Sequence, residues 1–325
     1  MKSPPPSSRR AAFLFPGYGM QHAGMGRALR DAFPAVEKDL HETDELLGRA
    51  VSAGMDGPER FLFPRPDSPD LTVPMDVTLA LSLAVARALR RGGARPDAAA
   101  GRSMGEFSAA AFAGVFGTAD CFRMVRAVAL EGREYCLKAP STVVNVFGPD
   151  RARLEAIAAG IKKDGHFCEV LAFYDKPRLG VAGLTASGLG ELKARLAPFR
   201  HRITATREMG AFHSTLFRGL TLRMSRLFRK LPFSAPSLPL YMNLDGGREA
   251  APARIRAKLA SAVSRPVRWQ ETIDNMLADG VRVFVELAPG AMLTEFICAL
   301  PPDAEVLRTD TPENFRRALR RLAAR

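Results

Sequence analysis

The pentapeptide Gly-Arg-Ser-Met-Gly at residues 101–105 constrains the fold of this chain more than any other feature. It follows an apolar run over 97–100 and precedes an alanine-rich amphipathic segment over 106–116, which predicts a strand, a tight turn and a helix. The glycines permit a strained turn that exposes the hydroxyl of Ser103. N–H groups at the start of the helix would stabilise an oxyanion beside that hydroxyl. The motif therefore favours a nucleophilic serine, although an ordinary strand-to-helix turn can carry the same letters.

Two further segments supply partners that a nucleophilic serine needs. A strand is predicted over 12–15 and runs into the glycine-rich turn Pro-Gly-Tyr-Gly-Met-Gln at 16–21, which can present a backbone N–H to a ligand. His213, in Ala-Phe-His-Ser, is a candidate base for the serine. The remaining histidines have no such context, and we interpret them as surface or packing residues.

The order and spacing of these segments resemble the malonyl-CoA:acyl-carrier-protein transacylase family. Two later motifs contribute, Arg-Pro-Val-Arg-Trp at 265–269 and Phe-Val-Glu-Leu-Ala-Pro-Gly at 284–290. The family includes stand-alone, trans-acting acyltransferases of polyketide synthases and acyl hydrolases. The resemblance implies an α/β fold: an α/β-hydrolase-like core with a parallel sheet, interrupted by a small ferredoxin-like subdomain, with the active site between the two.

The elements predicted from hydrophobic patterning agree with that division. Residues 1–10 are rich in proline and serine and are expected to be a disordered tail. Residues 11–139 and 210–325 form the expected core, and residues 140–209 the subdomain, with the β-α-β-β-α-β order of a ferredoxin-like unit. The subdomain strands are predicted at 143–147, 168–174, 179–182 and 203–209, and its helices at 151–161 and 188–196. In the later core, strands are predicted near 240–242 and 283–287 and helices at 269–278 and 313–324.

The resemblance assigns catalytic roles to individual residues. Ser103 is the nucleophile and His213 its base, oriented by main-chain carbonyl groups and not by an acidic third residue. The backbone N–H groups of Tyr18 and Met104 form the oxyanion hole, and Tyr18 stands where the family usually has glutamine. Asn243 matches a neighbouring family segment and is interpreted as structural.

One departure from the family bears on the acyl group. The family holds the free carboxylate of malonyl or methylmalonyl groups with an arginine in a Leu-Arg-Gly motif, whereas this chain has Leu-Glu-Gly with Glu131 at the centre. An arginine clamp attracts a carboxylate, and a second carboxylate in a dry cleft repels it. We therefore expect an acyl group that is not malonyl. Glu131 either pairs with a buried Arg102, binds a cationic acyl group, or faces out of the cleft because the alignment has slipped.

Other expected substrate-binding positions have lost a polar group. Val73 and Ala262 stand where the family has glutamines, and Gly210 replaces the first histidine of a specificity motif. Arg102 replaces the histidine that usually precedes the nucleophile, and Phe212 completes the set. These substitutions favour an uncharged or bulky acyl chain.

The charge of the chain concerns its partner. The formal net charge is +13, and its arginine-rich stretches are not interleaved with aromatic stacking residues, so nucleic acid is disfavoured. A basic surface would steer an acidic acyl carrier protein, or it reflects a composition in which arginine replaces lysine.

Composition excludes several other classes of protein. The four cysteines have no Cys-x-x-Cys spacing and no clustered histidines, so neither a zinc site nor a disulfide framework is expected. No apolar run reaches the roughly 18 residues of a membrane span. We expect a cytoplasmic monomer with no metal and no bound cofactor, whose substrate is acyl-CoA or a phosphopantetheinyl carrier-protein thioester.

The sequence therefore predicts an acyl-carrier-protein S-acyltransferase that works through an ester on Ser103. Three alternatives stay open at this point. The first is a hydrolase of the same family that clears acyl chains from carrier proteins, and the second is a non-catalytic protein that docks carrier proteins. The third is an unrelated esterase, which would need an Asp or Glu to orient its histidine.

Overall fold

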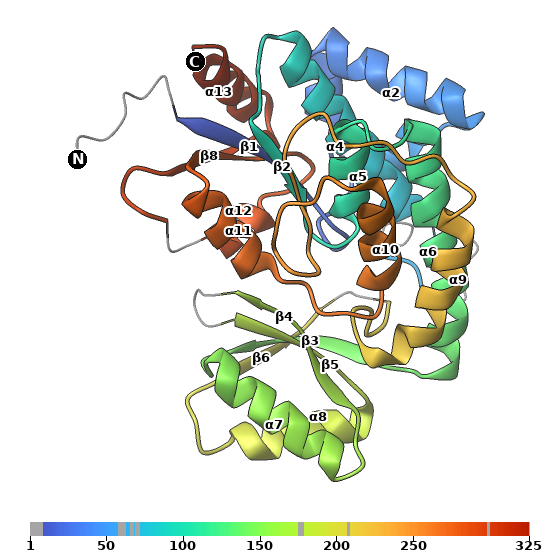
Figure 1. The fold of residues 1–325 in the computed structure, drawn as a ribbon, viewed down its shortest axis with the longest axis vertical. Coiled ribbons are helices and arrows are strands. Elements are labelled where there is room, and N and C mark those ends of the chain that lie inside the picture. Colours follow the sequence, from blue (N-terminus) through green and yellow to red (C-terminus); the bar gives the residue numbers. More distant parts are fainter. Residues whose placement is uncertain are drawn as a thin grey trace.

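Two β-sheets, each with its own helices, make up the chain (Figure 1). The computed structural model describes residues 9–57, 63–65, 68, 72–174, 179–206, 209–297 and 300–324. The larger sheet is parallel, in the order β7-β2-β1-β8-β9, and the smaller is antiparallel, in the order β4-β5-β3-β6. The predicted α/β fold with a parallel sheet is thereby confirmed, whereas the names α/β-hydrolase-like and ferredoxin-like stay predictions.

The strands of the larger sheet are β1 (Arg10–Phe15), β2 (Ala98–Gly101), β7 (Leu240–Tyr241), β8 (Val281–Glu286) and β9 (Glu305–Arg308). The strands of the smaller sheet are β3 (Thr142–Phe147), β4 (Cys168–Tyr174), β5 (Leu179–Leu184) and β6 (Arg202–Ala205). The helices that accompany the larger sheet are α1 (Arg27–Ala32), α2 (Pro34–Leu47), η2 (Ser52–Asp56), α4 (Val73–Arg91), α5 (Gly105–Phe112), α6 (Thr118–Lys138), η3 (Thr215–Phe217), α9 (Arg218–Phe228), α10 (Pro252–Ala262), α11 (Trp269–Ala278), α12 (Met292–Phe296) and α13 (Pro312–Ala323). The smaller sheet carries α7 (Arg151–Lys163) and α8 (Ala186–Leu196).

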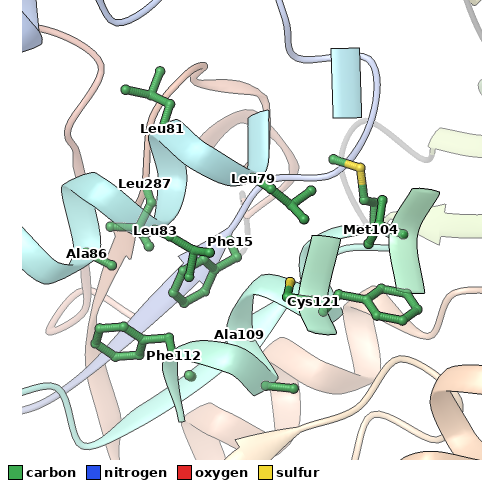
Figure 2. Close-up of a cluster of buried hydrophobic side chains, with 14 of the residues drawn as sticks. Phe15, Leu79, Leu81, Leu83, Ala86, Met104, Ala109, Phe112, Cys121 and Leu287 are labelled. Atoms are coloured by element: carbon green, nitrogen blue, oxygen red, sulfur yellow. The ribbon is translucent and has the colours of Figure 1, made fainter. Parts of the chain in front are cut away.

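β1 lies at the centre of the larger sheet and is buried on both faces. Its side chains alternate, so Phe13 and Phe15 pack into a core formed with α4 and α5, while Ala12 and Leu14 pack against Trp269 and other residues of α11 and α12. Figure 2 shows the first of these cores, with Phe15 beside leucines of α4. Helices on both faces thus fix the sheet from which the site is built.

The smaller unit follows the predicted order of elements, β3-α7-β4-β5-α8-β6. Its helices pack on the side away from the core (Figure 1). Its strands also turn apolar side chains, including Leu171 and Val181, toward the cluster that contains Trp269. An edge contact joins the units as well, because the N–H of Val267 donates to the carbonyl of Leu171 (2.8 Å).

Several predicted boundaries differ from the structure. Residues 1–8 lie outside the described residues, but Arg10 belongs to β1, so the expected tail of 1–10 is too long. The helix expected over 106–116 ends at Phe112 because Gly114 adopts a left-handed conformation (φ 80°). β6 ends at Ala205, before the expected limit of 209. Patterns in the sequence did not predict β9, α9, α10 or α12.

The topology brings two turns together at one edge of the parallel sheet. β1 and β2 are neighbours in register, with Phe15 opposite Gly101, so the segments that follow them lie side by side. This edge holds the carboxyl ends of the strands, where α/β proteins place their ligands.

Candidate active site

Ser103 stands on a sharp turn between β2 and α5. Its backbone is left-handed (φ 55°), an unfavourable conformation for a residue with a side chain. The turn packs against the end of β1, where a Cβ on Gly105 would lie 2.2 Å from the carbonyl oxygen of Phe15, and a Cβ on Gly17 would lie 2.5 Å from that of Arg102. Glycine is therefore required on both sides of this contact, which confirms the tight turn predicted from the motif.

His213 lies in the segment that follows the smaller unit. It also has a left-handed backbone (φ 68°), and its N–H donates to the carbonyl of Val263 (2.8 Å). Its ring Nδ1 lies 2.7 Å from the carbonyl oxygen of Ala262, the last residue of α10. A carbonyl only accepts hydrogen bonds, so Nδ1 carries the proton and Nε2 is the free acceptor.

The two side chains meet in the geometry of a nucleophile and its base. Ser103 Oγ lies 2.6 Å from His213 Nε2, and the tautomer fixed by Ala262 leaves Nε2 ready to accept the hydroxyl proton. No carboxylate contacts the His213 ring within the part of the chain that the structure describes. The C-terminal end of α10, with its partial negative charge, lies beside the ring instead and would stabilise the imidazolium. This is the carbonyl-oriented arrangement that the sequence resemblance implied.

Burial shifts the protonation of the base. Desolvation, together with the positive charge of Arg102, lowers the pKa of His213 to about 4, and the hydrogen bond to Ala262 opposes this shift only in part. His213 is therefore neutral at physiological pH, as a general base must be.

The predicted oxyanion donors flank the serine. Tyr18 and Met104 both line the cavity into which Ser103 projects. The N–H of Met104 precedes the first turn of α5 and makes no hydrogen bond to any residue that the structure describes. It is thus available to an oxyanion on the Ser103 side, while Tyr18 approaches from the turn after β1.

The cavity at Ser103 is mostly apolar. Its volume is about 100 Å³, and one water molecule needs roughly 10–15 Å³, so an acyl group of several carbon atoms fits. The smaller unit and the core both contribute to its wall. The lining residues are Tyr18, Met75, Arg102, Ser103, Met104, Phe107, Val125, Val128, Ala129, Val143, Leu171, Ala172, Val181, Met209, Gly210, Phe212, His213, Ala262, Val263 and Val267.

Four of the six predicted substrate-binding residues lie at this cavity: Arg102, Gly210, Phe212 and Ala262. Val73 does not, because it is the first residue of α4 and faces η2, where its Cγ1 would contact a Cβ on Gly54. The cavity contact on α4 comes from Met75, two residues later. The sequence resemblance therefore located the helix correctly and the contacting residue incorrectly.

The prediction that Glu131 lies in the acyl pocket is wrong. Its side chain is 45% exposed on the outer side of α6 and forms an ion pair with Arg223 (2.7 Å). At about 100° per residue, Glu131 lies roughly 110° from the middle of the arc formed by Val125, Val128 and Ala129. The helix phase directs it away from the cavity.

The expected pair between Glu131 and Arg102 is also absent. Arg102 Nε donates to the hydroxyl of Tyr174, and its guanidinium lies 5.6 Å from the centre of that ring and 5.8 Å from that of Phe296. Glu131 instead belongs to the exposed pairs of α6 and α9, so it neither compensates Arg102 nor reaches an acyl group.

Sequence reasoning missed Val125, Val128 and Ala129, which are the α6 residues that line the cavity. Their spacing of i, i+3 and i+4 identifies one face of a helix and could have found them. All three are apolar, so α6, which the structure describes in full, presents no cation to the cavity.

The rest of the described chain adds two negative findings. No group of three or more His, Cys, Asp or Glu side chains is arranged to hold a metal ion among residues 9–324 outside the gaps given above. Within the same residues, the helices are too short or too polar to cross a bilayer.

A family comparison matches most of this chain. Residues 12–300 match the acyl transferase domain family. The chain is 27% identical over 318 residues to the malonyl CoA-acyl carrier protein transacylase of Bacillus subtilis. The aligned region covers 96% of this chain and 97% of that protein. It is 29% identical to the polyketide biosynthesis protein ThaF of Burkholderia thailandensis, with 90% of this chain covered but 24% of ThaF.

Solved structures show the same fold. The malonyl-CoA:acyl carrier protein transacylase of Xanthomonas oryzae superposes with a TM-score of 0.87 at 25% identity, over 97% of this chain and 99% of that one. A malonyl-transacylase in complex with its type II polyketide synthase acyl-carrier protein gives a TM-score of 0.85 at 25% identity, over 96% of this chain and 99% of that one.

Proposed function

This chain belongs to the acyl transferase domain family, and from that premise we propose that it transfers an acyl group from a thioester to an acyl carrier protein through an ester on Ser103. The Bacillus subtilis relative is named as a malonyl CoA-acyl carrier protein transacylase, and ThaF is named as a polyketide biosynthesis protein. The observation that carries the proposal is the contact of 2.6 Å between Ser103 Oγ and His213 Nε2 at the wall of an acyl-sized cavity.

The geometry supports a two-step reaction. Ser103 Oγ attacks the thioester carbonyl carbon as His213 Nε2 accepts the hydroxyl proton, and the N–H groups of Tyr18 and Met104 receive the oxyanion. The C–S bond then breaks, and His213 returns the proton to the departing thiol. In the second step His213 Nε2 accepts the proton of the acceptor thiol as its sulfur attacks the ester carbonyl carbon. The bond from that carbon to Ser103 Oγ then breaks, and His213 returns the proton to the serine oxygen.

A second cavity adjoins the first and suits the donor arm of the thioester. The two share Tyr18, Arg102 and Val181 in their walls, so they lie next to each other. The second is lined by polar groups that include Asn145 and Thr206. Side-chain amide and hydroxyl groups suit the amides of a phosphopantetheine arm, which acyl-CoA and acyl carrier proteins both present.

We further propose that the acyl group carries no free carboxylate. The α6 wall of the cavity consists of Val125, Val128 and Ala129. The free carboxylate of a malonyl group would therefore lose its hydration at this wall without gaining a cation there. Arg102 is the charged side chain among the described residues that line the cavity, and its Nε donates to the hydroxyl of Tyr174. Glu131, on the outer side of α6, has no part in this selectivity.

Intact-mass measurement with a panel of acetyl, longer-chain and malonyl pantetheine thioesters tests both statements. Neutral acyl groups should load Ser103 and pass to added carrier protein. Loss of the ester to water at the same rate with and without carrier protein would indicate the hydrolase instead. A tenfold preference for malonyl, about 1.4 kcal/mol in activation free energy, would contradict the substrate class and assign the carboxylate to Arg102.

A further inference from the structure

The buried side chain of Asn243 contacts both ends of the turn that carries Ser103. The N–H of Ser103 donates to Asn243 Oδ1 (2.6 Å), and Asn243 Nδ2 donates to the carbonyl of Gly101 (2.6 Å). Rotating the amide by 180° would place its NH₂ group against the N–H of Ser103 and its oxygen against the carbonyl oxygen of Gly101. Neither pair can form a hydrogen bond, so the orientation of the amide is determined. One side chain therefore bridges the elbow from the end of β2 to the nucleophile.

Glu106 fixes Asn243 from the opposite side. Its Oε1 accepts a hydrogen bond from the N–H of Asn243 (2.6 Å), and its own N–H donates to the carbonyl of Ser103 (3.0 Å). Both side chains are almost fully buried, with exposures of 1% for Glu106 and 2% for Asn243. Three of these contacts close a ring through Ser103, Asn243 and Glu106, and the fourth joins Asn243 to Gly101.

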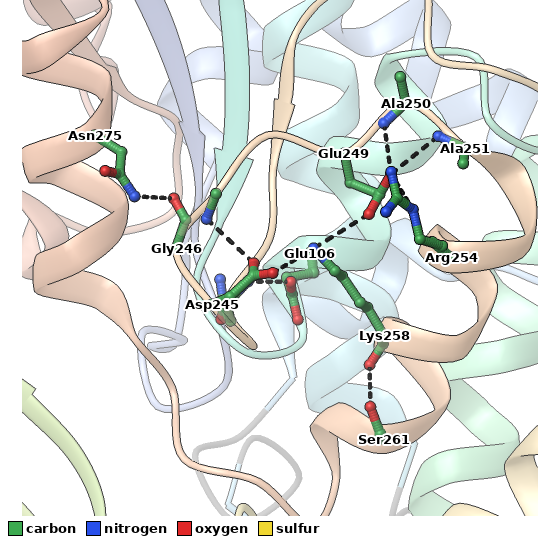
Figure 3. Close-up of polar contacts among 12 residues, drawn as sticks. Glu106, Asp245, Gly246, Glu249, Ala250, Ala251, Arg254, Lys258, Ser261 and Asn275 are labelled. Atoms are coloured by element: carbon green, nitrogen blue, oxygen red, sulfur yellow. Dashed lines mark hydrogen bonds and ion pairs between the residues drawn. The ribbon is translucent and has the colours of Figure 1, made fainter.

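The ring is anchored in a larger polar cluster (Figure 3). Asn243 follows β7, the neighbour of β2, and the same turn carries Asp245. Lys258 of α10 binds Asp245 (2.7 Å) and Glu249 (3.3 Å), close to Glu106 in the figure. α10 also supplies the Ala262 carbonyl that orients His213, so the helix that carries Lys258 also positions the base.

We propose that Asn243 and Glu106 are positioning residues that hold Ser103 in its left-handed conformation and aim its hydroxyl at His213. A left-handed residue other than glycine costs about 1–3 kcal/mol, so the turn relaxes unless its surroundings hold it. A displacement of about 1 Å is enough to slow a reaction by about 10²-fold. The inference rests on the proposed function only in that Ser103 is the nucleophile.

The test compares the full-length wild type with variants of the ring. Asn243→Ala removes both contacts with the elbow. Asn243→Asp keeps an acceptor for the N–H of Ser103 but places a carboxylate oxygen against the carbonyl oxygen of Gly101. Glu106→Ala removes the acceptor for the N–H of Asn243, whereas Glu106→Gln keeps it. Asn275→Ala is the matched control, because Asn275 donates to the carbonyl of Gly246 (3.0 Å) in the same turn and does not touch the elbow.

Two readouts are measured: single-turnover acylation of Ser103 by an acetyl pantetheine thioester, and labelling of Ser103 by diisopropyl fluorophosphate. In the labelling, the serine oxygen bonds to phosphorus, fluoride leaves and the hydroxyl proton passes to His213. Asn243→Ala should lower both rate constants by about 10²-fold while the apparent Kd for the thioester changes by less than about twofold. Glu106→Gln and Asn275→Ala should stay within about threefold of the wild type.

The outcomes separate this inference from the proposed function. A wild type that resists both reagents at Ser103 would overturn the proposed function. The positioning role is wrong if the wild type is labelled and the Asn243 variants, once shown to be folded, react at the same rate. It is also wrong if those variants lose affinity for the thioester while their limiting rate is unchanged. Should Asn243→Ala fail to fold by circular dichroism, Asn243→Asp and Glu106→Ala decide the question by the same criteria.

Discussion

At the scale of single residues, Ser103 and His213 share an unfavourable backbone. They are the two residues other than glycine with positive φ in the portion of the chain that the structure describes. Each donates a hydrogen bond from its main-chain N–H, the serine to Asn243 Oδ1 and the histidine to the carbonyl of Val263. Strain concentrated at two residues in mutual contact is typical of a functional site.

The lowered pKa of His213 gives a prediction about pH. The base works while neutral, so the limiting acylation rate should hold from pH 8 down to its pKa of about 4 and fall below it, whereas an exposed histidine would lose activity near 6.5. Arg102→Gln removes a repelling positive charge, which raises the pKa of His213 and moves the acid limb to higher pH. Single-turnover rates across pH measure both.

Arg123→Gln is the control for this series, because Arg123 pairs with Asp120 on the exposed surface of α6. It should leave the acid limb unchanged. A wild-type limb near pH 6.5, or an equal shift in both arginine variants, would contradict the assigned environment of His213.

At the scale of elements, α6 shows how helix phase decides the role of a residue. The same helix carries Val128 on its cavity side and Glu131 on its outer side, three residues apart. A motif match located the helix but selected Glu131, which lies roughly 110° around the helix from the middle of the residues that meet the cavity. The phase of the helix therefore corrects the residue, and the proposed substrate class rests on the apolar α6 wall instead.

Val128→Arg and Glu131→Arg form a matched pair for this prediction. An arginine at 128 places a cation at the cavity, so malonyl loading relative to acetyl loading should rise at least tenfold, about 1.4 kcal/mol. An arginine at 131 stays on the exposed surface and should change the ratio less than about twofold, since exposed pairs contribute about 0–1 kcal/mol. Competition between malonyl-CoA and acetyl-CoA gives the ratio. If Glu131→Arg raised the ratio of malonyl to acetyl loading more than Val128→Arg did, Glu131 would have to lie in the pocket.

At the scale of the whole molecule, the site depends on contacts between the two units. Glu169 of β4 accepts hydrogen bonds from the N–H (2.8 Å) and the hydroxyl (2.5 Å) of Thr215, two residues after His213. The smaller unit thus holds the segment that carries the base, besides forming one wall of the cavity.

Removing this contact should affect stability and turnover together. Glu169→Ala leaves the Thr215 N–H without its partner, which should cost about 1–3 kcal/mol of unfolding free energy and lower the acylation rate as the His213 segment loosens. Urea unfolding and single-turnover acylation measure the two effects. An unchanged midpoint and rate would show that the contact does not support the site.

The net charge of +13 bears on how the whole protein meets a carrier protein. If the basic surface steers an acidic partner, transfer to acyl carrier protein should slow steeply as salt shortens the Debye length to about 3 Å at 1 M. Transfer to free pantetheine should change little over the same salt series. Equal slopes for the two acceptors would show that the charge has no part in docking.

Sequence patterns predicted the parts of this site that depend on local chemistry. The Ser103 elbow requires glycines at fixed spacing, so the letters alone specify the turn, and the order of strands and helices in the smaller unit follows from alternating patterns. Residues whose role depends on helix phase or on distant contacts, such as Val128, Met75 and Glu106, escaped prediction. Glu106, for example, accepts its hydrogen bond from Asn243, which is 137 residues away in sequence.

The assignment of Ser103 as the nucleophile is tested most directly by measuring the mass of the protein after brief exposure to acetyl pantetheine thioester. The wild type should gain one acetyl group, mapped by peptide analysis to Ser103, and release an equivalent of thiol. Ser103→Ala should gain none, while Ser237→Ala, which removes a hydroxyl that donates to the carbonyl of Ala113, should acylate like the wild type. An adduct of normal yield on the Ser103→Ala protein, or on a residue other than Ser103 in the wild type, would contradict the assignment of Ser103 as the nucleophile.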